Sequence, residues 1–217
     1  KGLDDAAFRR CLSLGVSRRA LLSSLLSGHA KAAQFPVSPV SPLYPADLEQ
    51  AESVVAFTDT LNTCEIRPSR TLRLLVNSEN SFKVSMARQI AAAFTAAGAA
   101  TETVELPWEE YTAALTAGRF DLYYGEVRLT ADWDVSSLLA TGGSLNYGGW
   151  SDPQCDQLLE GCRSGGNREA AVRGLCRYLQ SQAPILPICF KTVSTLYESD
   201  VLEGLTPTAA EPFYGLE

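Results

Sequence analysis

The first part of the chain carries apolar side chains at helical spacing. This spacing predicts helices over residues 4–14, 18–26 and 48–61, the last with Asp47 as its N-cap. Between the second and third helices, residues 34–46 contain four prolines. Because proline fixes the backbone and donates no backbone hydrogen bond, this stretch is expected to form an extended connection on the surface.

The period of the pattern changes from residue 70 onward. Runs typical of strands occupy residues 71–77, 101–106 and 120–129, and helical runs over residues 81–97 and 108–117 separate them. Strands that alternate with helices in this way pair in parallel, because each helix carries the chain back to the start of the next strand.

The last third of the chain predicts two more helices and a strand. The helices are expected over residues 153–162 and 168–182, with Asp152 and Asn167 as their N-caps. A final strand is expected over residues 185–196. Together, the patterns predict one α/β lobe in which helices cover a mixed sheet.

The composition fits a globular protein that does not bind nucleic acid. The chain has 217 residues, 46% of them hydrophobic, which is enough for one sizeable core or two small ones. Its net charge of −7 has the wrong sign for a nucleic-acid-binding surface. The pairs Arg9–Arg10 and Arg18–Arg19 are expected on solvated helix faces.

Two features bear on targeting. No window of the sequence is apolar over the length of a membrane span. Residues 1–5 lack the pattern of a signal peptide, and the abrupt start inside a helical pattern predicts that the sequence is a fragment.

The cysteines and the single histidine predict neither a metal site nor a catalytic site. The six cysteines form no CxxC pair and accompany only His29, so no zinc site, other metal or cofactor is expected. A nucleophile needs a base within hydrogen-bond reach, and His29 is the only histidine, so an enzyme is not expected. Free thiols, which fit a reducing compartment, are favoured over disulfides. Pairing of Cys155 or Cys162 with Cys176 remains an alternative.

The stretch over residues 120–134 is the most informative part of the chain. An aromatic strand runs into a cluster of charges and is followed, over residues 142–150, by a glycine-rich polar loop. Strands that end this way typically deliver side chains to a ligand cleft. Without an acid–base pair or an activated nucleophile nearby, the pattern indicates a binding protein.

Five stretches, in register over most of the chain, carry a resemblance to a known family. They are residues 5–22, 73–98, 111–122, 146–159 and 184–188. The chain resembles the C-terminal lobe of the extracellular solute-binding proteins of ABC importers, in the oligopeptide, dipeptide and nickel-binding family 5. The resemblance implies one lobe of a periplasmic-binding-protein-like type II fold.

The resemblance also implies a domain organisation and a function. Residues 1–217 are expected to be a single C-terminal lobe that lacks its N-terminal lobe, with residues 201–217 packing toward the missing lobe. The protein is expected to be a bacterial extracytoplasmic receptor, lipid-anchored at the cell membrane. It would deliver a solute, with peptides as the expected class, to the membrane subunits of an ABC permease. Because both lobes would contribute affinity, this lobe alone is expected to bind weakly.

The resemblance places ligand contacts in the segment after the third strand. In the family, an Asp there pairs with the α-amino group of a peptide, and Asp132 fits that position with a one-residue shift. The sequence departs from the family at Glu126 and Arg128, where Gly-Trp is expected. Glu126, Arg128 and Asp132 could instead form an internal ion-pair network, and Arg128 could clamp a ligand carboxylate or pair with Glu126.

Several polar and aromatic side chains complete the expected ligand-binding set. The full set is Asp132, Trp133, Asp134, Arg128, Glu126, Tyr124, Asn146 and Tyr147. A structural role remains open for both aspartates, and a plain surface turn remains open for Asn146 and Tyr147. Tyr123 and Tyr124 are expected on opposite faces of their strand, and Trp108 is expected in packing more than in ligand contact.

One alternative function remains open at this stage. Some proteins fuse this binding fold to an upstream DNA-binding domain and act in the cytoplasm as solute-sensing transcriptional regulators. The six cysteines agree with that alternative, because free thiols persist in a reducing compartment. The solute itself is not named by the sequence, since similar-looking members bind peptides, opines, nickel chelates and sugars.

Overall fold

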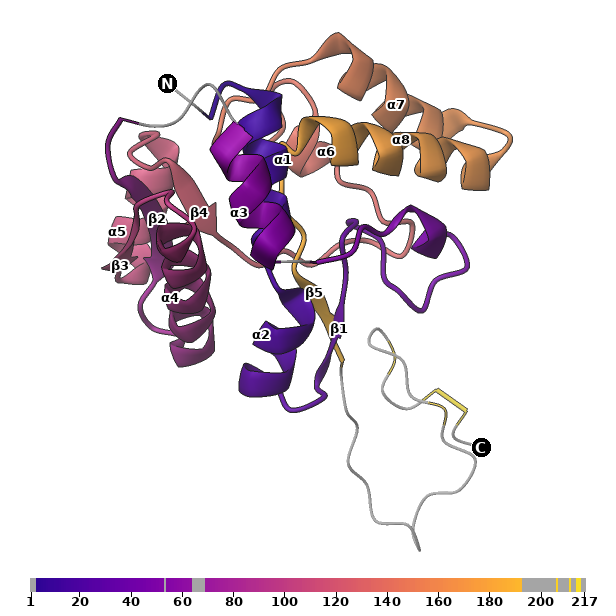
Figure 1. Cartoon of the computed structure of the whole chain (residues 1–217). Coiled ribbons are helices and arrows are strands. Elements are labelled where there is room, and N and C mark those ends of the chain that lie inside the picture. Colours follow the sequence, from indigo (N-terminus) through magenta and orange to yellow (C-terminus); the bar gives the residue numbers. More distant parts are fainter. Residues whose placement is uncertain are drawn as a thin grey trace, which may run out of the picture.

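A computed structural model describes residues 3–52, 54–63, 69–192, 206, 211, 214 and 215 (Figure 1). Within this part of the chain, a parallel sheet has the strand order β3–β2–β4. Its strands are β2 (Leu72–Asn77), β3 (Thr101–Leu106) and β4 (Leu122–Tyr124). Both neighbours pair with β2 in parallel, which confirms the pairing expected from alternating strands and helices.

Two helices connect these strands and cover opposite faces of the sheet. The helices are α4 (Ser81–Ala96) and α5 (Trp108–Thr116). Leu74 belongs to the buried cluster that contains α4, whereas Leu75 belongs to the cluster that contains α5. Tyr123 and Tyr124 divide in the same way, as expected for neighbours on a strand.

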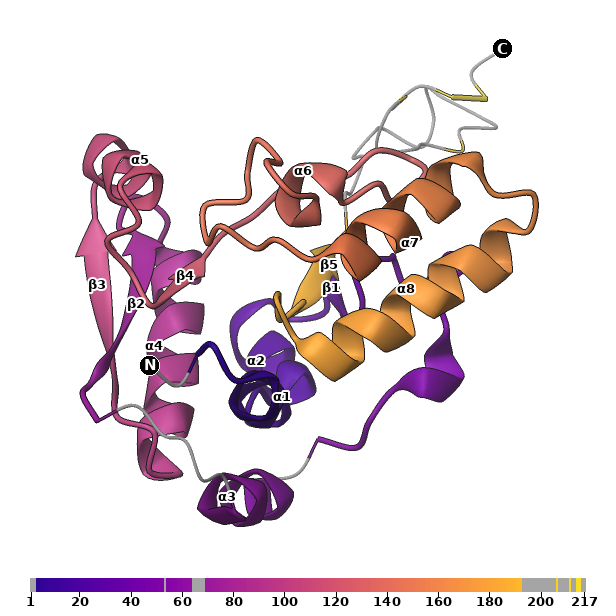
Figure 2. The same cartoon turned by 90° about the horizontal axis from the view of Figure 1, so that it is seen from above.

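The main core lies on the face covered by α4. Three further helices, α1 (Ala6–Leu14), α2 (Arg18–Leu25) and α3 (Val54–Thr63), contribute buried side chains to it. Figure 2 shows α1, α2 and α4 on the same side of the strands. Phe57 packs close to Gly15, where a Cβ atom would lie 2.6 Å from the ring, so glycine permits this close approach.

Helices α7 (Pro153–Ser164) and α8 (Arg168–Gln182) lie side by side and bury a second cluster against α6 (Ser136–Leu139). Both expected N-caps are confirmed. The Asp152 side chain accepts a hydrogen bond from the backbone N–H of Cys155 (2.9 Å), and Asn167 accepts one from Ala170 (3.0 Å). Short helix α6 was not predicted.

A two-stranded antiparallel ribbon is separate from the parallel sheet. It pairs β1 (Ala30–Ala32) with β5 (Cys189–Lys191). In place of the single mixed sheet expected from the sequence, the described residues therefore form a parallel sheet and a separate antiparallel ribbon. Strand β5 lies within the strand expected over residues 185–196, whose last residues fall outside the described ones. The expected packing of residues 201–217 also falls almost entirely outside them.

The third helix begins later than its sequence pattern predicts. Only a turn of 3₁₀ helix, η1 (Ala46–Leu48), follows Pro45, and α3 starts at Val54. Asp47 is not its N-cap. Instead, the Asp47 carboxylate pairs with the Arg173 guanidinium, with Nη1 2.8 Å from Oδ1. This contact joins residues far apart in the sequence, so helical periodicity could not reveal it.

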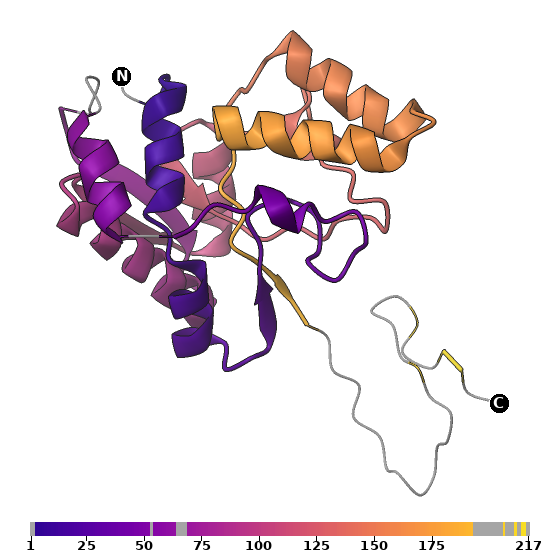
Figure 3. The ribbon, with the colours of Figure 1, turned by 45° about the vertical axis from the view of Figure 1, so that its right-hand side comes forward.

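The proline-rich connection is irregular, as expected, but it is not confined to the surface. Phe35 and Val37 are buried against Val172 and Cys176 of α8. Figure 3 shows the connection passing beneath α8. The third strand is also shorter than the expected 120–129, because β4 ends at Tyr124 and residues 125–129 form no strand.

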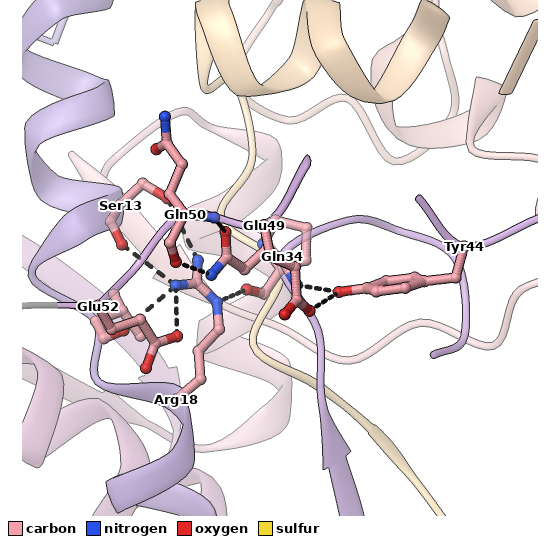
Figure 4. Close-up of polar contacts among 9 residues, drawn as sticks. Ser13, Arg18, Gln34, Tyr44, Glu49, Gln50 and Glu52 are labelled. Atoms are coloured by element: carbon pink, nitrogen blue, oxygen red, sulfur yellow. Dashed lines mark hydrogen bonds and ion pairs between the residues drawn. The ribbon is translucent and has the colours of Figure 1, made fainter. Parts of the chain in front are cut away.

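Arg18 is buried, 2% exposed, in contrast to the expected solvated helix face. Its guanidinium donates to the backbone oxygens of Pro187 (2.7 Å) and Val16 (3.3 Å). It also donates to the Glu52 carboxylate (3.3 Å), as Figure 4 shows. These bonds connect the α1–α2 junction to the segment before β5 and to the segment before α3. Arg9 is partly buried as well, whereas Arg10 and Arg19 are exposed as expected.

Cys155, Cys162, Cys176 and Cys189 are free thiols, so the alternative pairing of Cys155 or Cys162 with Cys176 is not formed. Burial raises the pKa of Cys176 to about 12, which keeps this thiol protonated. Cys64 lies outside the described residues. None of the described helices combines the length and apolar character needed to cross a membrane.

Candidate functional site

The carboxyl edge of the parallel sheet is the most distinctive surface of the described chain. Strands β2, β3 and β4 end there at Asn77, Leu106 and Tyr124. In open α/β sheets, ligands bind outside the carboxyl ends of the strands, because loops and helix N-termini there are free to vary around a rigid frame. A ligand is therefore expected near the segments that follow these three strands.

Each of these segments presents a large apolar side chain to solvent. Phe82 follows β2 and is 55% exposed, Trp108 follows β3 and is 55% exposed, and Val127 follows β4 and is 39% exposed. We call these three residues the edge hydrophobics. Among the described residues, the other exposed large apolar side chains are Val40 and Tyr214. Exposed apolar side chains that concentrate at one edge are typical of a surface that a ligand or partner covers.

Hydrogen bonds within and between the loops after β2 and β3 hold the segments that carry Phe82 and Trp108. Asn77 Oδ1 accepts from the backbone N–H of Glu79 (2.7 Å), and Asn80 caps α4 by accepting from Lys83 (3.0 Å). Glu79 Oε1 accepts from the backbone N–H of Trp108 (2.9 Å), so the loops after β2 and β3 are joined. The first turns of α4 and α5 are thereby held next to the sheet.

Glu126 pairs with two lysines rather than with Arg128 or Asp132. Its Oε2 atom lies 3.1 Å from the Lys83 ammonium and 2.8 Å from the Lys191 ammonium. Partial burial raises the pKa of Glu126, but the bonds from both lysines outweigh it and hold this pKa below its ordinary value. The expected internal network of Glu126, Arg128 and Asp132 is therefore wrong, because the counter-ions come from α4 and β5.

Arg128 is exposed, and no carboxylate among the described residues pairs with it. The alternative in which Glu126 neutralises Arg128 is thus not observed. A guanidinium without an internal counter-ion keeps its donors available for a carboxylate or phosphate.

Asp132 and Asp134 have different surroundings. Asp132 is exposed and accepts a hydrogen bond from the Thr130 hydroxyl, which lowers the pKa of Asp132 and favours its charged form. Asp134 Oδ1 accepts from the backbone N–H (2.8 Å) and the hydroxyl (2.5 Å) of Ser136. Asp134 is therefore engaged at the start of α6, whereas Asp132 retains free acceptor capacity.

Trp133, between the two aspartates, is half-buried in the packing of the connection. Its indole N–H donates to Ser41 Oγ (3.2 Å), and its ring meets Phe190 edge-on with centroids 5.5 Å apart. Its φ of +57° lies in the left-handed region, which is uncommon for a bulky residue. A depression beside it shares no lining residue with the edge hydrophobics. It is lined by residues 132–135, by Pro36 and Val37 of the connection, and by apolar and thiol side chains of α7 and α8 together with Arg163 of α7.

The remaining candidates maintain the shape of the loop. Asn146 donates to the carbonyls of Ala140 (3.1 Å) and Trp150 (2.6 Å), which closes the loop around Gly143. Tyr147 packs edge-on against Tyr123, with centroids 6.1 Å apart. The Tyr124 side chain packs against the main core, and burial raises its pKa.

The structure thus divides the expected site residues into three groups. Tyr124 ends β4, with Glu126 and Arg128 just after it; residues 132–134 form a separate turn; and Asn146 with Tyr147 closes a loop. The sequence did not single out Phe82, Lys83 or Lys191, and it assigned Trp108 to packing. Their position along the chain could have identified three of them, because Phe82, Lys83 and Trp108 lie in the segments that follow predicted parallel strands.

Comparison with known proteins places the chain in a family. Residues 1–148 match the family model described as bacterial extracellular solute-binding proteins, family 5 Middle. No curated protein matches the sequence.

Three solved structures show the same fold. The murein tripeptide binding protein MppA of Escherichia coli has 20% identity and a TM-score of 0.75, over 88% of this chain and 40% of that protein. NikZ of Campylobacter jejuni, bound to Ni(L-His), has 16% identity and a TM-score of 0.75, over 88% and 43%. A periplasmic oligopeptide-binding protein of an ABC transporter from Thermotoga maritima, bound to mannohexaose, has 15% identity and a TM-score of 0.78, over 97% and 46%.

The chain therefore spans less than half the length of these three proteins. At such low identity the likeness concerns the fold, and it confirms the expected periplasmic-binding-protein-like α/β architecture. The match over residues 1–148 identifies the family itself. This chain belongs to the bacterial extracellular solute-binding proteins of family 5.

Proposed function

We propose that this chain is the C-terminal lobe of a two-lobed receptor that captures a solute outside the cytoplasm and delivers it to the permease subunits of an ABC importer. The observation that carries this proposal is the exposure of Phe82, Trp108 and Val127 at the carboxyl edge of the sheet, in a chain of family 5. A second lobe closing over this edge would cover these side chains and enclose the solute. Residues 201–217 would pack against that lobe.

Peptides are the solute class that the exposed groups suit best. Asp132 offers a charged, solvent-accessible carboxylate that would accept hydrogen bonds from an α-amino group. Arg128 offers unpaired guanidinium donors for an acidic group, and the edge hydrophobics offer apolar area for side chains. The murein tripeptide binding protein of Escherichia coli, which shares the fold, agrees with this class.

The other candidate residues would act mainly by shaping the site. Asp134 and Asn146 would brace their own loops through hydrogen bonds, Tyr147 would pack that loop against Tyr123 of β4, and Trp133 would fix the turn that presents Asp132. Glu126 would set the charge at the end of β4 through its two lysines. No group in this scheme has to transfer a proton or form a covalent bond, in keeping with a binding protein.

Replacing Asp132 by asparagine tests the proposed amine contact. In the complete receptor, tripeptides with a free α-amino group should bind more tightly than their N-acetylated forms. Asp132→Asn should remove about 1.5–3 kcal/mol of that preference, or roughly tenfold to a hundredfold in affinity, because a charge-assisted hydrogen bond is lost. Calorimetric titration of both peptide forms would measure it.

Asp4→Asn is the matched control, since Asp4 is equally exposed but lies before α1. It should leave the preference unchanged. An undiminished preference in Asp132→Asn would remove Asp132 from the site.

The regulator alternative rests on the free thiols. Cys155, Cys162, Cys176 and Cys189 are unbridged, which suits a reducing compartment. Detergent phase partitioning of host cells separates the two proposals. A lipid-anchored species in the detergent phase supports the receptor, whereas a cytosolic species would favour a solute sensor fused to a DNA-binding domain.

A further inference from the structure

The start of helix α5 is capped by a residue from another loop. Pro107 precedes the helix and makes no capping hydrogen bond with its side chain. The first backbone N–H groups of a helix have no partner within it, so a cap has to come from outside. Glu79, which follows β2, accepts from the Trp108 backbone N–H through Oε1 (2.9 Å). Glu79 therefore does for α5 what an N-cap residue usually does from within its own helix, and its charge suits the helix dipole.

The Glu79 carboxylate is held in place by the end of β2. The Asn77 side chain there is buried, and its Oδ1 atom accepts from the Glu79 backbone N–H (2.7 Å). The backbone N–H of Ser78 donates to the carbonyl of Leu106 at the end of β3 (2.8 Å). The loop after β2 thus continues the pairing of the sheet and brings Glu79 to the start of α5.

A second hydrogen bond joins α5 to the end of β4. The hydroxyl of Tyr111, three residues along α5 from Trp108, donates to the backbone oxygen of Tyr124 (2.9 Å). Tyr111 is buried, and burial raises its pKa to about 12, which keeps the hydroxyl protonated as a donor. The Trp108 ring packs at a tilt against the Tyr111 ring. The same tyrosine therefore anchors the helix and contacts the exposed indole.

These two contacts converge on Trp108. Glu79 binds its backbone, and Tyr111 packs against its ring. Negative charge at the start of α5 does not depend on Glu79, because Glu109 and Glu110 already lie in the first turn. An exposed side chain ordinarily samples several rotamers, and a binding partner has to restrict them at an entropic cost. A ring that is held before binding avoids part of that cost.

We infer that Glu79 and Tyr111 are positioning residues that hold the Trp108 ring in one orientation over the carboxyl edge, ready to contact the apolar part of a solute. The inference rests on the proposed function, which makes Trp108 a solute contact. Glu79 acts on the backbone of Trp108 and Tyr111 acts on its ring, so neither has to touch the solute. Both increase affinity by ordering the ring before the solute arrives.

Fluorine NMR of the complete receptor, labelled with 5-fluorotryptophan, tests the orientation of the ring without a ligand. The Trp108 signal is the one that disappears in Trp108→Phe, and wild type should give a single narrow signal there. Glu79→Ala and Tyr111→Phe should each broaden or split it, because the ring then samples several orientations. The signals of Trp133 and Trp150 should stay unchanged, which would show that the fold is retained.

Two further variants separate the hydrogen bond from a general effect of charge. Glu79→Gln should resemble wild type, because its amide oxygen can still accept from the Trp108 N–H. Glu110→Ala is the matched control, since Glu110 is an exposed acid of the same first turn. It should leave the Trp108 signal unchanged.

Calorimetric titration of the complete receptor with the tripeptide Ala-Phe-Ala measures the consequence for binding. Glu79→Ala should weaken binding about tenfold, and Glu79→Gln should restore most of the loss. In the Trp108→Ala background, Glu79→Ala should change affinity by less than about twofold, because Glu79 acts through that ring. A residue that only stabilises the fold would give the same loss in both backgrounds.

An unchanged Trp108 signal in Glu79→Ala would overturn the inference, and so would equal losses of affinity in the two backgrounds. If Tyr111→Phe fails to fold, the Glu79 variants still decide. The proposed function fails separately. A Trp108→Ala receptor that binds Ala-Phe-Ala as well as wild type would remove Trp108 from the solute surface. Failure of wild type to bind this tripeptide would count against peptides as the solute, and the fluorine signal would then decide whether Glu79 and Tyr111 hold the ring.

Discussion

Arg18→Met is expected to lower the free energy of unfolding by about 3–5 kcal/mol. The guanidinium is buried and donates to Pro187, Val16 and Glu52 (Figure 4). Burial lowers the pKa of Arg18. The Glu52 carboxylate offsets part of this shift, because it stabilises the charged guanidinium. Removal of the guanidinium would take a hydrogen-bond donor from Glu52 and from the carbonyl groups of Pro187, Ser13 and Val16.

Urea denaturation of the variant and of wild type would measure this loss. Arg19→Met provides the matched control, since Arg19 is the next residue on the same helix and is exposed. It should change stability by no more than about 0.5 kcal/mol. A loss below about 1 kcal/mol for Arg18→Met would mean that the buried network does not hold the α1–α2 junction to the β5 segment.

Trp108→Ala is expected to weaken solute binding to the complete receptor by about 2 kcal/mol, or roughly thirtyfold. Trp108 is more than half exposed at the first position of α5, stacked at a tilt against Tyr111 with centroids 6.0 Å apart. A solute enclosed against this ring would bury the apolar area that is now exposed. Stability should change little, because the folded chain does not bury most of the side chain.

Paired measurements of affinity and thermal stability would separate binding from folding. Val40→Ala is the matched control, because Val40 is also an exposed apolar residue but lies in the proline-rich connection. It should leave affinity unchanged. If Trp108→Ala bound the solute as well as wild type, the carboxyl edge would not be the solute surface.

Local periodicity predicted the parts of the fold that depend on local sequence. The alternation over residues 71–117 gave the parallel strands and their helices, and the N-caps Asp152 and Asn167 act within their own helices. Features that depend on distant partners were missed. Strand β1 pairs with β5 across most of the chain, and Asp47 pairs with Arg173 rather than capping a helix.

In the candidate site, too, the features that depend on distant partners were missed. Glu126, Arg128 and Asp132 were grouped because they are close in sequence, yet Glu126 finds its counter-ions on α4 and β5. Trp108 looked like a packing residue because an aromatic at helical spacing usually is one. Its exposure follows from its place after β3, at the edge where parallel strands end. The order and direction of the strands, rather than the residue types, therefore identify the carboxyl edge as the candidate site.

The arrangement of the carboxyl edge agrees with a lobe that supplies only part of the contacts to its ligand. The apolar side chains and the cations lie on an open surface, and the depression beside Trp133 is a separate feature. Hinge closure against a second lobe would supply the enclosure that the edge lacks. Without that lobe, solute contacts would be few and binding would be weak.

Native mass spectrometry with a tripeptide library, on the full-length gene product and on residues 1–217, tests this account most directly. We expect the full-length protein to retain a single peptide per molecule at micromolar concentrations and the 217-residue chain to retain none. Retention of the same peptides by the shorter chain at micromolar concentrations would contradict the half-site. Failure of the full-length protein to retain any peptide would contradict the assignment of peptides as its solutes.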